Sequence, residues 1–277
     1  MSVTGRFRFS VHNHGFFRLD GGSMFGVVPR TIWARLAPPD EDNRIRLATR
    51  SLLIDAGERR FLVDLGNGEK WPEKTRAFYA IENLPAAEVG LDLASVTDII
   101  LTHLHFDHAG GISRFRAATA APERESSGPR VYVQADNYET ARHPNIRERA
   151  SYLAETVDGL EASRLELTRG SQEIFPGLWV HGGNGHTRGH QWVEVKEDGQ
   201  TVVYPGDLIP TSHHVPLPYT MGYDMSAETL LVEKEDFLRR AVAGDWVVVF
   251  EHDPEIAAAR LKVDERGRYA LREAVAI

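Results

Sequence analysis

The sequence predicts an α/β protein folded as a single domain over residues 1–277, and two observations support this class. Short apolar runs rich in β-branched residues recur along the chain, and segments with helical character lie between several of them. The composition shows no break that would divide the chain and no internal repeat, and 277 residues is an ordinary length for one large α/β domain.

The N-terminal part of the chain is expected to be rich in strands. Aromatic and polar residues alternate after residue 7, which indicates a strand, and the glycines of 21–26 indicate a loop. Residues 96–101 are apolar and β-branched, which is typical of a buried strand. In order, the expected elements are a strand from residue 7, a glycine-rich loop at 21–26, strands at 47–54 and 60–65, helical structure at 71–83 and a strand at 96–101.

The C-terminal part of the chain is expected to contain both strands and helices. Residues 117–130 are rich in Ala, Ser, Pro and Gly, so we expect a mobile surface excursion there. Ser226 is the expected N-cap of a helix that runs to about Ala243. The other expected elements are strands at 130–134, 173–181, 191–195 and 201–204, two or three helical pieces over 137–168 interrupted at Pro144, and a final strand at 246–250.

Composition excludes several classes of protein. The formal net charge of −8 argues against a nucleic-acid surface, which needs a basic stripe. No apolar run of about 18 residues is present, so no membrane span is expected, and the first residues lack the apolar core of a signal peptide. We expect a cytoplasmic protein. Because cysteine is absent, any metal ion must be held by imidazole and carboxylate groups.

Four potential metal ligands lie close together directly after the strand expected at 96–101: His103, His105, Asp107 and His108. In an extended segment, His103 and His105 are two positions apart and point the same way. Asp107 and His108 lie beyond the strand, where a turn can direct them to a neighbouring point. Burying so many polar groups without a partner would be costly, so the pattern indicates metal binding. Its geometry suits two adjacent ions better than one.

A strand that stops at a potential ligand recurs four more times in the chain. These ligands are Asp64, His186, Asp207 and His252. In sheet-based folds, binding groups gather on the loops at one edge of the strands. We therefore expect these side chains to converge on the cluster that begins at His103.

The pattern His-x-His-x-Asp-His at 103–108 resembles that of the metallo-β-lactamase-fold hydrolase superfamily. The fuller string His-Leu-His-Phe-Asp-His-Ala-Gly-Gly looks most like the lactonase-type branch, which includes the N-acyl homoserine lactonases. The order of the later ligands also matches, so the resemblance covers roughly residues 45–255. It implies an αββα sandwich, in which two mixed β-sheets carry helices on their outer faces.

The resemblance also implies two metal sites. The first ion would be held by His103, His105 and His186, the second by Asp107, His108 and His252, and Asp207 would bridge them. Ligation by nitrogen and oxygen suits two divalent ions, most simply Zn²⁺, but also Fe²⁺, Mn²⁺ or Co²⁺. Asp107, Asp207 and a bridging hydroxide would supply the negative charge that two adjacent cations require.

Two further polar residues are assigned from the resemblance. Asp64 follows the strand at 60–65 and would support the metal centre from behind the ligands. The string Gly-His-Thr-Arg-Gly-His offers both His186 and His190 as the single histidine ligand. The superfamily uses the first histidine of this string, so His186 is preferred and His190 is expected to be a structural neighbour.

The chemistry expected of such a centre is metal-assisted hydrolysis. A water that bridges two ions has its pKa lowered toward neutrality and becomes the nucleophile, while one ion polarises the oxygen of the substrate. Lactonase relatives place a tyrosine after the bridging aspartate, and two tyrosines, Tyr219 and Tyr223, follow Asp207 here. Their spacing from Asp207 is longer than in the best-known homoserine lactonases, and Tyr223 is slightly preferred as the donor to the substrate.

The resemblance points to a small-molecule lactone or ester as the substrate. The glycine-rich segment at 21–29 resembles a part of lactonase-like proteins that borders the pocket and a dimer contact, so a homodimer is also expected. An apolar wall for an acyl chain or aromatic group could be formed by Met24, Phe25, Phe106, Ile209, Leu217 and Met221.

Other functions remain open on the same fold. A phosphotriesterase or arylesterase would use the same metal ions in a more open, aromatic pocket. A thioesterase of the glyoxalase II type would need a basic patch near the ligand loops, and the sequence shows none. A binding module without activity would be expected to have lost ligands, whereas every ligand position is filled here.

Overall fold

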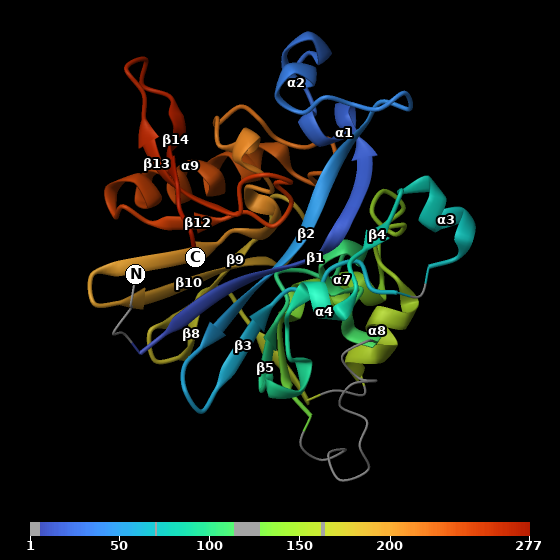
Figure 1. Ribbon diagram of the computed structural model, residues 1–277, viewed down its shortest axis with the longest axis vertical. Coiled ribbons are helices and arrows are strands. Elements are labelled where there is room, and N and C mark those ends of the chain that lie inside the picture. Colours follow the sequence, from blue (N-terminus) through green and yellow to red (C-terminus); the bar gives the residue numbers. More distant parts are fainter. Residues whose placement is uncertain (1–5, 70, 114–127, 162–163) are drawn as a thin grey trace.

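Two seven-stranded sheets lie face to face in the computed structural model, which describes residues 6–69, 71–113, 128–161 and 164–277 (Figure 1). Helices cover the outer face of each sheet. The expected αββα sandwich of two mixed sheets is therefore confirmed. The sheets matter for function because the ends of strands from both of them meet at one edge of the sandwich.

The first sheet is formed by the N-terminal part of the chain. Its strands lie in the order β4-β1-β2-β3-β5-β6-β7, antiparallel from β4 to β3 and parallel from β3 to β7. Parallel neighbours need long crossover connections, which here run over the outer face. The strands are β1 Arg8–Asp20, β2 Arg44–Asp55, β3 Arg60–Val63, β4 Glu82–Asn83, β5 Asp98–Ile100, β6 Arg130–Gln134 and β7 Arg164–Thr168.

The second sheet is formed by the C-terminal part of the chain, in the order β14-β13-β12-β11-β10-β9-β8. All neighbours are antiparallel except β11 and β12, which are joined by a long helix. The strands are β8 Gln172–Phe175, β9 Leu178–Gly183, β10 His190–Glu197, β11 Gln200–Tyr204, β12 Val247–Val249, β13 Ala258–Val263 and β14 Tyr269–Ala274.

In the part of the chain that the structure describes, three helices of eight or more residues cover the sheets. α7 (Ala135–Arg142) and α8 (Ala154–Glu161) pack on the first sheet, and α9 (Ala227–Ala243) packs on the second. The N-cap of α9 is Ser226, as expected, since its side chain accepts from the backbone N–H of Thr229. The shorter helices are α1 Gly21–Phe25, α2 Arg30–Leu36, α3 Glu73–Phe78, α4 Ala86–Val89, α5 Phe106–Ala109, η1 Leu93–Ser95, η2 Gly206–Leu208 and η3 Ser212–His214.

The cores follow the alternation of side chains along each strand. In β3, Phe61 and Val63 belong to the cluster between the sheets, and Leu62 belongs to the cluster under α7 and α8. On the second sheet, Val203 and Val248 face α9 in a third cluster. Both faces of these central strands are therefore buried, which explains their continuous apolar composition.

The long strands β1 and β2 continue past the sandwich and carry α1 and α2 at their far end (Figure 1). A fourth apolar cluster fills this extension and reaches the metal-ligand segment through Phe106. The expected loop at 21–26 is wrong, because Asp20 caps Ser23 and starts the short helix α1. This extension forms one wall of the candidate site.

Several other expectations need correction. Residues 164–168 were expected in a helical piece but form the edge strand β7, whose neighbour β6 supplies hydrogen bonds. The single strand expected at 173–181 is a hairpin, because Gly177 takes a left-handed φ of 85° between β8 and β9. Helical structure at 71–83 is limited to α3 and is followed by the strand β4.

The C-terminal segment adds two strands, β13 and β14, beyond the final strand expected at 246–250. Residues 117–127 of the excursion expected at 117–130 lie outside the described residues, and β6 begins at Arg130. Among the described residues, no helix combines the length and the apolar composition that crossing a membrane requires.

Candidate metal centre

The candidate ligands lie where strands of both sheets end at the same edge. The first sheet contributes the segment that follows β5 and enters α5, with His105 as the residue before the helix. The second sheet contributes the turn between β9 and β10, the turn η2 after β11, and the segment after β12. Residues more than 100 positions apart in the sequence therefore meet in one place.

The first group of ligands is formed by His103, His105 and His186, which are all buried. The Nε2 atom of His103 lies 3.0 Å from Nδ1 of His105, and Nε2 of His186 lies 3.3 Å from the same Nδ1. Three imidazole nitrogens thus point at one small volume. Such convergence is the arrangement in which three histidines hold a single metal ion.

The second group is formed by Asp107, His108 and His252, also buried. The Nε2 atoms of His108 and His252 are 3.2 Å apart. A carboxylate oxygen of Asp107 lies 3.7 Å from Nε2 of His252, and the other lies 3.8 Å from Nε2 of His108. These three residues are the ones that the sequence assigned to a second ion.

Asp207 lies between the two groups. Its Oδ2 atom is 3.2 Å from Nε2 of His186 and 3.5 Å from Nε2 of His108, and its Oδ1 atom is 3.2 Å from Nε2 of His252. One carboxylate therefore reaches ligands of both groups. Oδ1 has no hydrogen-bond partner within the described part of the chain, although it is buried. A metal ion would satisfy it.

Three histidines are oriented by partners on their second ring nitrogen. Nδ1 of His103 lies 3.1 Å from the hydroxyl of Thr102, Nδ1 of His186 lies 2.9 Å from Oδ1 of Asp224, and Nδ1 of His252 lies 2.8 Å from the carbonyl of Ala48. Such partners fix the tautomer, so that Nε2 presents its lone pair to the ion.

Carboxylates stand behind the other two histidines. Nδ1 of His108 lies 3.1 Å from Asp64 and 2.8 Å from Glu251, and Nε2 of His105 lies 3.9 Å from Glu148. Asp64 also accepts from the backbone N–H and the hydroxyl of Thr102, both at 2.7 Å, and has a left-handed φ of 57°. The structure places Asp64 where the sequence expected it.

The charges of the site favour a cation in the second group. Burial alone would lower the pKa of His108, but Glu251, Asp207 and Asp107 raise it well above its usual value. The pKa of His252 is likewise raised to about 9 against burial, by Asp207 and then Glu251. In the first group, burial lowers the pKa of His103 well below its usual value, which keeps its lone pair available. The residues present thus fit two divalent cations.

His190 is a buried neighbour of the first group and is not part of either cluster. Its ring centroid lies 5.3 Å from that of His103 and 5.9 Å from that of His186. Burial lowers its pKa well below the usual value. The structure therefore brings His186, and not His190, to the ligand position.

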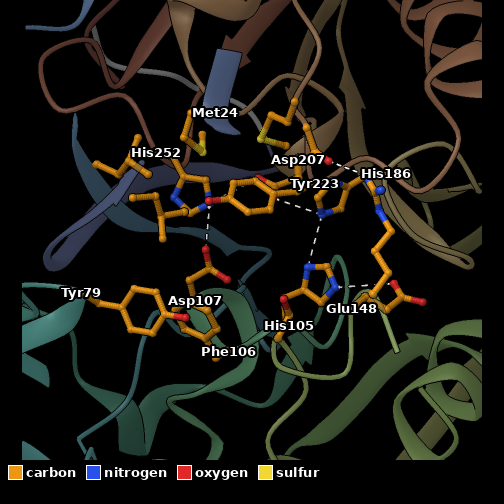
Figure 2. A pocket seen from close by; sticks show the side chains of 16 residues that line it. Met24, Tyr79, His105, Phe106, Asp107, Glu148, His186, Asp207, Tyr223 and His252 are labelled. Carbon is orange, nitrogen blue, oxygen red and sulfur yellow. Dashed lines mark hydrogen bonds and ion pairs between the residues drawn. The ribbon is translucent and has the colours of Figure 1, made fainter. Parts of the chain in front are cut away.

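A cavity of about 240 Å³ opens over the ligands. Figure 2 shows Asp107 and His252 directed at each other on one side, and His105 and His186 directed at each other on the other. Tyr79 and Phe106 lie beside Asp107, whereas Glu148 lies beside His105. The other lining residues are Leu19, Met24, Leu47, Arg147, Ser151, Asp207, Met221, Gly222 and Tyr223.

The expected apolar wall is only partly correct. Met24, Phe106 and Met221 line the cavity. Phe25 does not, because its buried ring is stacked between Trp33 and His214.

Two further residues of the expected wall belong to the apolar cluster between the second sheet and α9. Ile209 lies in the apolar cluster under α9, fully buried and away from the cavity, and Leu217 packs against the same cluster. Both side chains therefore stabilise the fold, and Leu19 and Leu47 of the extension at α1 line the cavity instead.

The two candidate tyrosines have different surroundings. Tyr223 lines the cavity, and burial raises the pKa of its hydroxyl to about 12. Tyr219 does not line it, because its ring packs edge-on against Phe25 and its carbonyl accepts a hydrogen bond from Lys234 at 2.6 Å.

Sequence reasoning missed several polar groups of the site. Tyr79, Arg147, Glu148 and Ser151 line the cavity, and Asp224 and Glu251 contact ligand histidines. Apart from Glu251, the neighbour of His252, none of them lies next to a ligand motif in the sequence. Only Glu251 therefore carried a signal that could have identified it.

Comparison with known families agrees with this geometry. The model of the Metallo-beta-lactamase superfamily matches residues 44–252, so the chain belongs to this superfamily. A crystal structure of a probable metal-dependent hydrolase from Staphylococcus aureus is similar, with a TM-score of 0.84 and 27% identity over 98% of this chain and 99% of the other.

Curated relatives include lactonases. An N-acyl homoserine lactonase of Bacillus thuringiensis is 32% identical over 117 residues, which is 42% of this chain and 40% of that protein. The chain thus matches about two fifths of the length of this relative. The lactonase AttM of Rhizobium radiobacter is 26% identical, over 70% of this chain and 72% of its own length. The dizinc quorum-quenching lactonase AidC shares the fold, with a TM-score of 0.73 and 16% identity over 99% of this chain and 96% of its own.

Proposed function

We propose that this protein is a metal-dependent hydrolase that binds two divalent ions and opens a lactone or a related ester. The observation that carries this proposal is the pair of ligand groups joined by Asp207 beneath a partly apolar cavity. The lactonases among its relatives support the choice of substrate class. Zinc is the proposed metal because the donors are imidazole and carboxylate groups.

The ions and the protein have separate tasks in this reaction. When bound, two divalent ions lower the pKa of a water molecule and polarise the ester carbonyl. His103, His105 and His186 would hold the first ion, and Asp107, His108 and His252 the second. Asp207 would contribute a negative charge close to both ions, which would reduce their repulsion.

Tyr223 is the proposed donor to the substrate. Because its pKa is raised to about 12, the phenol keeps its proton at neutral pH and can donate a hydrogen bond. The charge that develops on the carbonyl or leaving oxygen would be stabilised by this donor. Tyr79 is a second phenol of the cavity, near Asp107 (Figure 2), and is the residue against which Tyr223 must be tested.

The shape of the cavity supports a substrate with an apolar substituent. Met24, Leu47 and Phe106 offer apolar contacts for an acyl chain or an aromatic ring. Arg147 is the only lysine or arginine among the described residues that line the cavity, and its guanidinium already donates to backbone carbonyls. This argues against a thioester substrate with several carboxylates, such as a glutathione derivative.

Activity and metal content test the proposal together. Protein purified without chelator and supplied with Zn²⁺ should contain two ions per chain by elemental analysis, and His252→Ala should contain fewer. A panel of lactones, aryl esters and phosphotriesters should then give the highest kcat/KM with a lactone. A stoichiometry of one ion in both proteins would contradict the two-ion centre, and preference for a phosphotriester would contradict the lactone.

A further inference from the structure

We propose that Arg147 is a positioning residue that holds Tyr223 at the metal centre. One nitrogen of its guanidinium, Nη2, donates to the backbone carbonyls of Gly222 and Asp224, the second at 3.5 Å. These are the two residues that flank Tyr223 in the chain. The inference rests on the proposed function, in which Tyr223 donates to the substrate.

The turn that carries Arg147 is fixed to the metal ligands. Asn145 braces this turn, since its side chain donates to Glu148 at 2.6 Å and accepts from the N–H of Arg147 at 2.8 Å. Glu148 in turn accepts from Thr187 at 2.7 Å, directly after His186. The backbone of Arg147 is therefore held in place by contacts with the segment that carries His186.

A second contact fixes the end of the same turn. The carbonyl of Ser151 accepts from the backbone N–H of Phe106 at 2.9 Å, between the ligands His105 and Asp107. The turn thus contacts both ligand-bearing segments of the first group. The side chain of Arg147, which extends from this turn, is therefore held in a fixed position relative to the ligand segments.

The loop that carries Tyr223 is fixed near the metal ligands by Asp224, whereas its tip is held by contacts with two other segments. The carboxylate of Asp224 accepts from the N–H of Met221 at 2.7 Å and contacts His186 at 2.9 Å. At the tip, Gly222 has no side chain and Tyr223 is 38% exposed. The N–H of Gly222 donates to the carbonyl of Ser23 at 2.7 Å on one side. Arg147 supplies the contact on the other side.

The physical consequence is preorganisation of the phenol. A donor contributes to the transition state only if it is already aimed when charge develops. Without Arg147, the tip would be held by Ser23 alone, and Tyr223 would leave the cavity for part of the time. A misplacement of about 1 Å can cost up to about 10²-fold in rate. The loss should appear in kcat, because the ion ligands and the apolar wall are untouched.

A double-mutant cycle tests this inference. The proteins are wild type, Arg147→Ala, Tyr223→Phe and the double variant, each brought to full metal content. Arg149→Ala is the matched control, because Arg149 is exposed on the same turn and its side chain makes no hydrogen bond or ion pair with the described residues. We expect Arg147→Ala to lower kcat about 10- to 100-fold with little change in KM, and Arg149→Ala to resemble wild type.

The cycle separates positioning from direct binding. If Arg147 acts through Tyr223, the double variant should be no slower than Tyr223→Phe. If the two single substitutions lower kcat by factors that multiply in the double variant, or if Arg147→Ala mainly raises KM, the inference is overturned. Arg147 would then contact the substrate directly. Equal activity of Arg147→Ala and wild type would also overturn it.

Hydrogen exchange tests the same contact without any substrate. The amide of Gly222 should exchange faster in Arg147→Ala, whereas amides of the ligand turn at 184–187 should stay as protected as in Arg149→Ala. Unchanged exchange at Gly222 would overturn the inference. If the wild type opens no lactone, the proposed function fails, and hydrogen exchange alone still decides whether Arg147 holds this loop.

Discussion

Asp207 is the residue on which both ligand groups depend. Its two oxygens face different histidines, His186 and His252, which come from different connections of the second sheet. No other carboxylate among the described residues reaches both groups. In the proposed two-ion centre its negative charge would be shared, so its loss should affect both ions at once.

Asp207→Asn should weaken the binding of both ions, because the amide keeps the shape and loses the charge. We expect at least about a tenfold loss of affinity in competition with a chromogenic chelator. Asp264→Asn removes an equal charge from an exposed turn and serves as control. A variant that retains both ions normally but no longer turns over would instead make Asp207 a general base.

Tyr223→Phe should lower kcat for lactone opening by about 10²–10³-fold, because the donor to the developing charge is lost. Tyr219→Phe should have little effect, since that side chain packs against Phe25 outside the cavity. Tyr79→Phe measures how much the other phenol of the cavity contributes to kcat. Steady-state kinetics at equal metal content would contradict the assignment if Tyr79→Phe, rather than Tyr223→Phe, caused the larger loss.

The sequence predicted ligands better than it predicted their surroundings. Few residue types bind metal ions, and the ligands here directly follow apolar strands. The sequence therefore predicted His103 and its neighbours as ligands. Glu148 and Asp224 contact ligand histidines that are distant in the sequence. They lie in loops without a repeating pattern, so the sequence does not distinguish them from surface acids. Phe25 was misassigned because neighbours in a short helix point in different directions, and the sequence predicted a loop there.

The helix α9 fixes two loops of the site although it lies on the outer face of the sheet. Glu233 accepts from the N–H groups of Asn184 and Gly185, at 2.7 and 3.1 Å, directly before His186. Lys234 donates to the carbonyls of Pro216 and Tyr219, at 3.0 and 2.6 Å. The helix therefore sets the positions of both the ligand turn and the loop that leads to Tyr223.

Lys234→Met should change how stability depends on pH. Burial lowers the pKa of Lys234 from 10.5 to about 7. Between these values the unfolded chain binds more protons than the folded one, so this lysine makes the free energy of unfolding rise as pH rises from 7 to 10.5. Below pH 7 the cost of burying the charge is present in full.

Urea denaturation at several pH values tests this expectation. The difference in unfolding free energy between wild type and Lys234→Met should grow in favour of wild type from pH 7 to 10. The variant also leaves two carbonyls without their donor, at a cost of about 1–3 kcal/mol for a buried group. A difference that stays constant across this range would mean that Lys234 has the same charge in both states.

The sequence predicted buried strands better than exposed edge strands. The strand β5 is buried throughout and contains two isoleucines, and the sequence located it well. The edge strands β7 and β14 are largely exposed and contain several charged residues, so no buried face marks them as strands. In both cases the pairing with a neighbouring strand decides the structure, and a single sequence does not contain that information.

At the scale of the whole molecule, the candidate metal centre lies where the two sheets meet. His103, His105, Asp107 and His108 follow a strand of the first sheet, and His186, Asp207 and His252 follow strands of the second. An ion held by both sets of ligands would link the sheets at their common edge. Such an ion binds the folded state and not the unfolded chain, so it should stabilise the fold.

Removal of metal should therefore lower the melting temperature. At a free metal concentration of 1,000 times Kd, one site contributes about 4 kcal/mol to the free energy of unfolding. Thermal scans with and without chelator should show this difference in wild type. A variant with His103→Ala and His252→Ala should show much less response to chelator, and an equal response in both proteins would mean that the chelator acts elsewhere.

The order of ligands along the chain also determines when the centre can be completed during synthesis. His103 to His108 are made early, His186 and Asp207 follow, and His252 comes last. A nascent chain that has reached residue 207 carries the first ligand group but lacks one ligand of the second. A second ion would therefore find its full set of ligands only after residue 252 has left the ribosome. In the proposed two-ion centre, metal supplied after this point could fill both sites, whereas metal supplied earlier could fill only the first with its full set of ligands.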